Sequence, residues 1–312
     1  MDISIVLPVY NEVDNLQPLC GEIATAMREL GRDYEIILVD DGSSDGSREL
    51  LATMAEEDKR LKVVLFRRNF GQTPAMMAGF DYASGDIIIT LDADRQNDPA
   101  DIPMLIAKIE QGYDLVSGWR YQRKDGFLLR RLPSMIANRI ISYTTDVSLH
   151  DYGCSLKAFR SEVAKSLHLY GEMHRFIPAI ASWMGVRIAE IKVNHRPRVA
   201  GTSKYGISRT FRVILDLIAV KYLLSYSSRP VQFFGSLGLF SGALGTLITF
   251  WLVFERLFMA VPLGNRPLLL FAVLLIFIGL QFITVGLLAE MQTRIYHETQ
   301  DKPVYVVREV IN

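Results

Sequence analysis

Two aspartates separated by one residue carry the clearest chemical signal in the sequence. Asp92 and Asp94 directly follow Ile87–Leu91, an apolar run that predicts a buried β-strand. Mg²⁺ and Mn²⁺ prefer oxygen ligands and often share them with the phosphates of a bound nucleotide. The pair therefore predicts a site for a divalent cation and a diphosphate. A solvated acidic loop is the alternative, and it would be favoured for an Asp-x-Asp pair away from a strand end.

Two earlier polar loops also follow predicted strands. Ile3–Leu7 leads into Pro8-Val9-Tyr10-Asn11-Glu12, and Tyr34–Val39 leads into Asp40-Asp41-Gly42-Ser43. Carboxylates accept hydrogen bonds from a base N–H or from ribose hydroxyls, and a tyrosine ring can pack against a base. These loops indicate a nucleoside site. Asp-Asp-Gly-Ser is equally suited to a turn or a helix N-terminus, so that structural role remains open.

The elements that must position these loops alternate in type along the chain. Short runs rich in Val and Ile, separated by amphipathic stretches, lie at Ile3–Leu7, Tyr34–Val39, Leu61–Phe66, Ile87–Leu91 and Leu115–Ser117. The alternation predicts an α/β domain with a mostly parallel sheet covered by helices on both faces. Ligands bind such sheets at the carboxyl ends of the strands, where the polar loops would meet. Helical material over Leu128–Val147, a strand and helix within Ser155–Trp183, and a strand near Val186–Val193 complete the domain.

The C-terminal third carries two long apolar runs. Val231–Phe254 and Pro267–Ala289 contain no charged residue, and each is long enough to cross a bilayer core of roughly 30 Å. We therefore predict two transmembrane helices. Before them, apolar residues recur at helical spacing among Arg and Lys, which predicts an amphipathic juxtamembrane helix within 207–230. A surface helix packed on the globular domain is the alternative.

The flanking charges predict how these helices are oriented. Arg and Lys residues are more frequent on the two outer flanks of the apolar runs than between them, which favours both ends on the cytoplasmic side. The N-terminus shows no secretory signal, so we expect the front domain in the cytoplasm. The expected organisation is a catalytic domain at 1–206, the amphipathic helix at 207–230, two spans within 231–290 and a cytoplasmic tail at 291–312.

Composition narrows the partners. Half of the residues are hydrophobic, so membrane lipids are expected partners. Lys plus Arg equals Asp plus Glu at 34 each, and this balance gives no reason to expect nucleic acid as a partner. Cys20 and Cys154 are isolated, which argues against a disulfide framework or a zinc site. Gly238 and Gly242, four residues apart, form a small-residue face that could support a homo-oligomer through the membrane helices. The ordinary glycine content of a membrane helix is the alternative.

Taken together, the motifs resemble those of family 2 glycosyltransferases of the polyisoprenyl-phosphate type. The likeness covers essentially the whole chain and is carried by Pro8–Glu12, Asp40–Ser43, Arg68–Gly71, Asp92–Gln96 and Arg198–Tyr205. Bacterial bactoprenol glucosyltransferases are the most similar, and dolichyl-phosphate mannose synthases resemble the soluble part. The resemblance implies a Rossmann-like GT-A fold at the bacterial inner membrane and a requirement for Mg²⁺ or Mn²⁺. It also implies inverting transfer of one sugar to polyisoprenyl (undecaprenyl) phosphate, which yields a lipid-linked donor for cell-envelope glycosylation.

The resemblance further implies a donor and a set of functional residues. Glucose from UDP-glucose is the expected donor, with another UDP-sugar or GDP-mannose as the alternative. The nucleotide-sugar residues are Pro8, Tyr10, Glu12, Asp40, Asp41, Gln96 and Arg120. The metal and diphosphate residues are Asp92, Asp94 and Gln96, the acceptor and phosphate residues are Arg198, Ser203 and Lys204, and the catalytic residues are Asp94 and Asp151. Arg131, on the amphipathic segment before Asp151, could attract the anionic lipid head, although a solvated basic face is the alternative.

Three points in this assignment remain open. Arg95 stands where the family often has Leu and could alter phosphate contacts, and we leave Asp98 out of the metal site. Asp151 could act as a base or could orient the acceptor. The second pKa of a phosphomonoester is near 6, so the acceptor is largely an anion already and positioning is favoured. A processive synthase would need more membrane helices, and a non-catalytic scaffold would leave the motifs unexplained.

Overall fold

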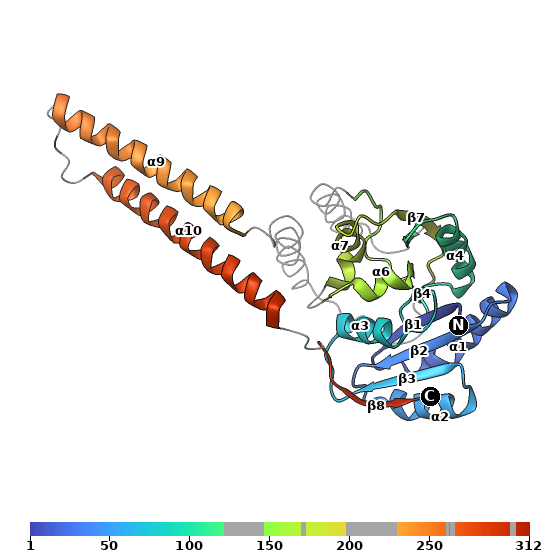
Figure 1. The fold of residues 1–312 in the computed structure, drawn as a ribbon. Helices are drawn as coiled ribbons and strands as arrows, with labels where there is room; N and C mark the ends of the chain where they lie inside the picture. The colour runs from blue at the N-terminus through green and yellow to red at the C-terminus, as the bar shows by residue number, and fades with distance from the viewer. Residues whose placement is uncertain (122–146, 170–172, 198–229, 260–261, 263–265, 300–303) are drawn as a thin grey trace. The chain divides into compact units, whose positions relative to one another are not determined.

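The computed structural model describes residues 1–121, 147–169, 173–197, 230–259, 262, 266–299 and 304–312 (Figure 1). The chain divides into two compact units, Met1–Val220 with Pro303–Asn312, and Lys221–Lys302. The expected helices over 128–147 and 207–230 fall, wholly or nearly so, outside the described residues.

The first unit is built on a mixed eight-stranded sheet. Its strands are β1 Ile3–Val9, β2 Tyr34–Asp40, β3 Leu61–Phe66, β4 Ile87–Thr90, β5 Leu115–Arg120, β6 Lys157–Arg160, β7 Ile188–Val193 and β8 Val307–Ile311, in the order β7-β5-β6-β4-β1-β2-β3-β8. The pairings β4–β1, β1–β2, β2–β3 and β5–β7 are parallel. β6 is antiparallel to both of its neighbours, and β8 is antiparallel to β3. The α/β class predicted from the alternation is confirmed, with antiparallel strands that the alternation did not indicate.

Helices cover both faces of the sheet. They are α1 Val13–Leu30, α2 Ser47–Glu57, α3 Gln72–Tyr82, α4 Ile102–Glu110, α6 Ser161–Ser166 and α7 Ile177–Ser182, with short 3₁₀ turns η1 Pro99–Asp101 and η3 Met173–Phe176. α1, α2 and α4 pack together over one face, and α3 and α6 contact each other over the opposite face (Figure 1). The loops that lead from β1, β2, β3 and β4 toward these helices start at the carboxyl ends of the strands. Ligands bind sheets of this kind at those ends.

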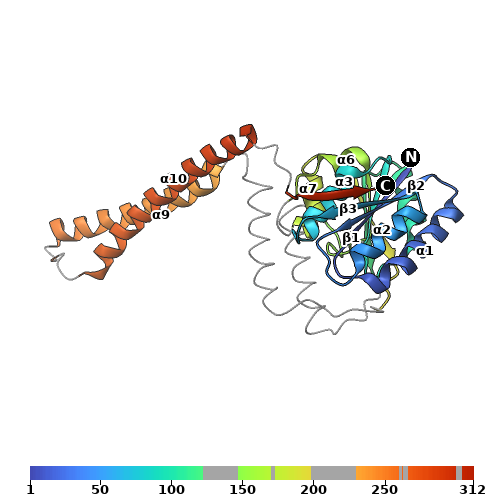
Figure 2. The same ribbon diagram turned by 90° about the horizontal axis from the view of Figure 1, so that it is seen from below.

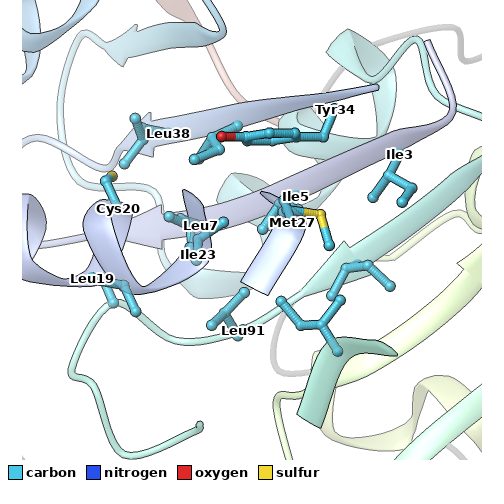
Figure 3. Packing of buried hydrophobic residues seen from close by; sticks show 14 of the residues in the cluster. Ile3, Ile5, Leu7, Leu19, Cys20, Ile23, Met27, Tyr34, Leu38 and Leu91 are labelled. Atoms are coloured by element: carbon cyan, nitrogen blue, oxygen red, sulfur yellow. The ribbon is translucent and has the colours of Figure 1, made fainter. Parts of the chain in front are cut away.

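The core on the α1 face follows from the spacing of apolar residues. Leu16, Leu19, Ile23 and Met27 recur at three- and four-residue intervals along α1, and each is 0–1% exposed. They pack against alternate residues of β1 and β2, among them Leu7 and Leu38 (Figure 3). Burial of a side chain of this size contributes about 2 kcal/mol, so this stripe fixes α1 on the sheet.

The C-terminal residues provide a strand that the sequence did not predict. β8 pairs with β3, with Val64 opposite Val310, and runs alongside it (Figure 2). Just before β8, Tyr305 stacks on Phe66 at a centroid distance of 5.1 Å and donates a hydrogen bond to Asp81 at 2.7 Å. The segment expected as a cytoplasmic tail therefore ends as a strand in the sheet of the first unit.

The second unit is a pair of long helices, α9 Pro230–Phe258 and α10 Pro267–Thr299. Segments Phe234–Phe258 and Pro267–Ala289 are long and apolar enough to cross a membrane. A Cβ added at Gly238 would lie 2.6 Å from the Gly279 carbonyl oxygen, and one at Gly245 would lie 2.6 Å from the Ala272 carbonyl oxygen. Gly238 and Gly245 thus pack closely on α10 of the same chain, whereas a Cβ at Gly242 would meet nothing within 4 Å. A homo-oligomer through the membrane helices stays a prediction.

Candidate active site

A cavity of about 330 Å³ lies at the carboxyl ends of β1, β2, β3 and β4. Its lining comes from the ends of these strands and the segments after them: Pro8, Val9, Tyr10, Glu12, Asp41, Asn69, Gly71, Gln72, Ala75, Asp92, Ala93 and Asp94. The structure thus brings together most of the residues expected to hold a nucleotide sugar and a metal. Their individual roles stay predictions.

The loops after β1 and β2 are tied to each other. The Asn11 backbone N–H donates to Ser43 Oγ at 2.9 Å, and the Ser44 N–H donates to Asn11 Oδ1 at 2.8 Å. Asn11 has a φ of 55°, a left-handed conformation that asparagine tolerates. This mutual bonding holds the two loops as one wall of the cavity.

Asp40 and Asp41 have different surroundings although they are adjacent. Asp40 is fully buried, pairs with Arg48 at 2.8 Å and accepts the Ser43 N–H at 3.1 Å. Asp41 lines the cavity and accepts the backbone N–H groups of Phe70 at 2.6 Å and Gly71 at 2.9 Å. Burial raises the pKa of Asp41 above its ordinary value, against the effect of these two hydrogen bonds. The structure therefore gives Asp40 the turn role and places only Asp41 where a ligand could meet it.

Asp92 and Asp94 form the acidic side of the cavity. Asp92 Oδ1 accepts a hydrogen bond from Gln72 Nε2 at 2.7 Å, and Asp94 Oδ1 accepts the Gln96 backbone N–H at 3.1 Å. Burial raises the pKa of Asp92, and the neighbouring charge of Asp94 raises it further, to about 6. A divalent cation would relieve this repulsion, and both side chains offer the hard oxygen ligands that Mg²⁺ and Mn²⁺ prefer. The pair fits such an ion.

Within the described parts of the chain, no group of three or more His, Cys, Asp or Glu side chains is arranged to hold a metal. Mg²⁺ typically takes one or two carboxylates from the protein and completes its shell with water and substrate phosphates. The site therefore suits an ion that arrives with a diphosphate.

Arg95, Gln96 and Asp98, which follow in the same loop, are not among the residues that line the cavity. Arg95 Nη2 bonds to Glu22 Oε1 on α1 at 2.5 Å, and Asp98 pairs with Arg196 at 2.7 Å. The Gln96 carbonyl accepts the Arg196 N–H at 2.9 Å, and the Gln96 side chain is not part of the lining. Arg95 and Asp98 thus each pair with a charged side chain of the protein, and their roles toward a phosphate or a metal stay predictions.

Arg120 and Asp151 form a buried ion pair. Arg120 donates from Nε to Asp151 Oδ2 at 2.7 Å and from Nη2 to Oδ1 at 2.8 Å, while its backbone N–H reaches Oδ2 at 3.3 Å. Burial lowers the pKa of Arg120, but the hydrogen bonds and charge of Asp151 outweigh burial and raise it above its ordinary value. Neither residue lines the cavity. Arg131, Arg198, Ser203 and Lys204 lie outside the described residues.

Comparison with known proteins decides the family. Residues 4–167 match the family described as "Glycosyl transferase family 2". The chain is 46% identical to a dodecaprenyl-phosphate galacturonate synthase of Rhizobium johnstonii, over all of this chain and 94% of that protein. This chain belongs to glycosyl transferase family 2. The enzyme is also 40% identical to an undecaprenyl-phosphate 4-deoxy-4-formamido-L-arabinose transferase of Shewanella sediminis, over 99% of this chain and 92% of that protein.

Solved structures support the fold of this family 2 glycosyltransferase. Glucosyl-3-phosphoglycerate synthase of Mycobacterium tuberculosis, in complex with Mn²⁺, UDP and glucosyl-3-phosphoglycerate, aligns with a TM-score of 0.56 and 19% identity, covering 72% of this chain and 79% of that one. The same protein with Mg²⁺ and UDP aligns with a TM-score of 0.55 and 20% identity, covering 72% and 79%. These alignments confirm the GT-A fold.

The glycosyltransferase also contains site residues that sequence reasoning missed. Gln72, the first residue of α3, holds Asp92 from the β3 side of the cavity. Its only signal in the sequence is its place directly after the Asn69-Phe70-Gly71 motif. On β6, Lys157 is 2% exposed, and its ammonium donates to the carbonyl oxygens of Tyr152, at 3.4 Å, and of Cys154. A lysine within a short apolar run gives no indication of such burial.

Proposed function

We propose that this glycosyltransferase moves one sugar from a nucleotide-sugar donor to the phosphate of a polyisoprenyl phosphate, with inversion at the anomeric carbon. The observation that carries the proposal is the convergence of Asp41 with Asp92 and Asp94 on one cavity at the strand ends. Two relatives whose printed names specify dodecaprenyl or undecaprenyl phosphate match nearly the whole chain, and they support the acceptor.

The donor would lie along the cavity. Asp41 and Glu12 offer carboxylate oxygens to the nucleoside, and Tyr10, at 38% exposure, offers a ring face. Asp92 and Asp94 would hold Mg²⁺ or Mn²⁺, which supplies positive charge to stabilise the departing diphosphate. Gln72 restrains the Asp92 carboxylate, so one oxygen is positioned before the donor arrives.

We assign Asp151 an orienting role in this reaction. Both of its oxygens accept hydrogen bonds from Arg120, so the carboxylate is held in one orientation. The acceptor phosphate attacks as an anion, and a fixed carboxylate and guanidinium can define its approach without proton transfer. A pH–rate profile of Asp151→Asn tests this role. A large rate loss that is constant with pH is expected. A loss confined to pH below about 6, where the acceptor phosphate still carries a proton that a base would remove, would instead support a base.

The sugar we propose differs from the one expected from sequence. Glucose from UDP-glucose was expected, but the two relatives are named for galacturonate and for 4-deoxy-4-formamido-L-arabinose. We therefore place the UDP forms of these two sugars ahead of UDP-glucose and GDP-mannose. A donor panel with defined undecaprenyl phosphate ranks them directly by kcat/KM.

We also propose that the helix pair anchors the enzyme in the bacterial inner membrane with the catalytic domain in the cytoplasm. Two segments long enough to span, Phe234–Phe258 and Pro267–Ala289, support the anchor. β7 precedes the pair and β8 follows it, and both belong to one sheet. If the helices span, both flanks must therefore emerge on the same side. Protease access to β8 in sealed inverted vesicles, and its protection in intact spheroplasts, is the expected result.

Transfer of labelled sugar to an organic-extractable lipid tests the function as a whole. The full chain in nanodiscs should transfer sugar with Mg²⁺ or Mn²⁺ and lose activity with EDTA. Asp92→Ala and Asp94→Ala should each lose on the order of 10²-fold or more in kcat. Asp98→Ala is the matched control, because Asp98 lies in the same loop but pairs with Arg196 outside the cavity lining. Undiminished transfer by the Asp92→Ala, Asp94→Ala double variant would refute the proposal.

A further inference from the structure

Glu190 is a nearly buried carboxylate that the proposed reaction has not used. It lies on β7, opposite Ser117 of β5, and its side chain is 10% exposed. Glu190 Oε1 accepts the backbone N–H groups of His150 and Asp151, both at 2.9 Å. Glu190 Oε2 lies 2.7 Å from His150 Nδ1 and 3.1 Å from the His150 backbone nitrogen. One carboxylate thus contacts two consecutive backbone amides.

These bonds act on the residue that pairs with Arg120. The Asp151 side chain is held by the Arg120 guanidinium from β5, and its backbone amide is held by Glu190 from β7. The two strands are parallel neighbours in register, with Arg120 opposite Val193. Asp151 is therefore fixed at both its backbone and its carboxylate, by charged groups from two adjacent strands.

A third charge holds the following residues of the same loop. The buried Lys157 ammonium donates to the carbonyl oxygens of Tyr152 and Cys154. Within the loop 150–154, two amides at its start are thus bonded to an anion, and the carbonyl groups of Tyr152 and Cys154 are bonded to a cation. Charge-assisted hydrogen bonds of this kind are shorter and stronger than neutral ones, so the loop is rigid where Asp151 projects from it.

We propose that Glu190 is a positioning residue for sugar transfer, which acts by fixing the backbone of Asp151. The inference rests on the function proposed above. Glu190 lies on β7 at one edge of the sheet, and the nucleoside loops follow β1 and β2 in its other half. Its loss should therefore reduce kcat and leave the affinity for UDP unchanged.

The contact with the two amides requires a side-chain oxygen acceptor at residue 190. An ionised Glu presents only acceptors, so it can meet two N–H groups and a ring nitrogen at once. Gln keeps one side-chain oxygen, and because Oε1 alone accepts both amides, that oxygen can retain both bonds. Met has a similar length but no such acceptor, so we expect Glu190→Met to fill a similar volume and release the amides of His150 and Asp151, and Glu190→Gln to retain them. A displacement of Asp151 by about 1 Å could cost up to roughly 10²-fold in kcat.

The matched control is His150→Ala. It removes the imidazole contact with Glu190 and the stacking of His150 on Trp119, but it keeps both backbone N–H groups. If Glu190 acts through the backbone, His150→Ala should retain at least about half of the wild-type kcat. An equal loss in both variants would assign the effect to the ring and overturn the proposal.

The experiment uses the full chain in nanodiscs and three readouts. Glu190→Met is expected to lower kcat by about 10- to 100-fold, to bind UDP as the wild type does, and to speed hydrogen exchange at the amides of residues 150 and 151. Unchanged kcat, or unchanged exchange at these amides, would overturn the inference. A parallel loss of UDP affinity would show a general structural role and would also overturn it.

The exchange readout separates this inference from the proposed function. A wild-type enzyme that transferred no sugar to polyprenyl phosphate from any donor of the panel would refute the proposed function. The exchange comparison between wild type and Glu190→Met needs no lipid acceptor. It would still decide whether Glu190 holds the backbone of Asp151.

Discussion

Removal of Arg120 should destabilise the catalytic domain more than removal of the pair to which it belongs. The Arg120 and Asp151 side chains are 16% and 5% exposed, and the pair is bidentate at 2.7 and 2.8 Å. Arg120→Met would leave the Asp151 carboxylate buried without its counter-charge. In the double variant Arg120→Met, Asp151→Asn, a neutral amide replaces that carboxylate, so no unpaired charge is left buried.

The magnitude follows from the cost of breaking a buried ion pair on one side, about 3–5 kcal/mol. The first unit comprises Met1–Val220 and Pro303–Asn312, a size at which 1 kcal/mol shifts Tm by about 2–4 °C. Arg120→Met should therefore lower Tm by about 10 °C. The double variant should lose clearly less than the sum of the two single variants, with a coupling of about 2–3 kcal/mol.

Thermal unfolding of the full chain in detergent, followed by near-UV circular dichroism, measures all four members of the cycle. The test is one of stability and does not depend on activity, which the proposed function expects to be low in all three variants. Strict additivity of the two single effects would mean that the pair contributes nothing as a pair. The assignment of Asp151 as a carboxylate fixed by Arg120 would then be wrong.

Three further predictions concern the sheet and its edges. Burial raises the pKa of Glu35, but hydrogen bonds from serine hydroxyls and a backbone amide outweigh it, so the folded pKa lies below 4.5. Its stabilisation is present above the unfolded pKa and is lost as pH falls through the folded one, so acid titration of unfolding should be shallower in Glu35→Gln. Gly79→Ala would place a Cβ 2.0 Å from Val6 Cγ1, and a loss of about 1–3 kcal/mol in denaturant melts should be rescued by adding Val6→Ala. Tyr305→Ala should cost about 3 kcal/mol and Tyr305→Phe, which loses only the bond to Asp81, about 1 kcal/mol, and equal losses in the two variants would refute a role for the stacked ring.

The sequence predicted the strands that carry the site better than it predicted which side chains face the cavity. The polar loops at the ends of β1, β2 and β4 converge as the β-α alternation requires. The choice between Asp40 and Asp41 could not be made from sequence, because adjacent residues at a strand end point to opposite sides. Arg48, seven residues beyond Asp41, supplies the partner that decides it, and nothing in the local sequence marks that contact.

Long-range pairings were the other part that sequence could not predict. β8 is a five-residue strand whose partner β3 lies more than two hundred residues earlier in the chain. Short strands carry little periodic signal, and the preference for βαβ connections gives no reason to expect an antiparallel edge strand. Glu190 was missed for a related reason. Its contact with the Asp151 backbone depends on the pairing of β7 with β5 and on a loop about forty residues earlier in the chain.

The position of β8 also affects the order in which the protein can mature. The ribosome must make both apolar helices before it makes the strand that covers β3, so a nascent catalytic domain exposes the backbone edge of β3 until the helix pair has emerged. An uncovered edge can pair with other chains. Chains halted within the helix pair should therefore be prone to aggregation and degradation. If the helix pair is the anchor proposed above, the catalytic domain is completed only after the anchor has been synthesised.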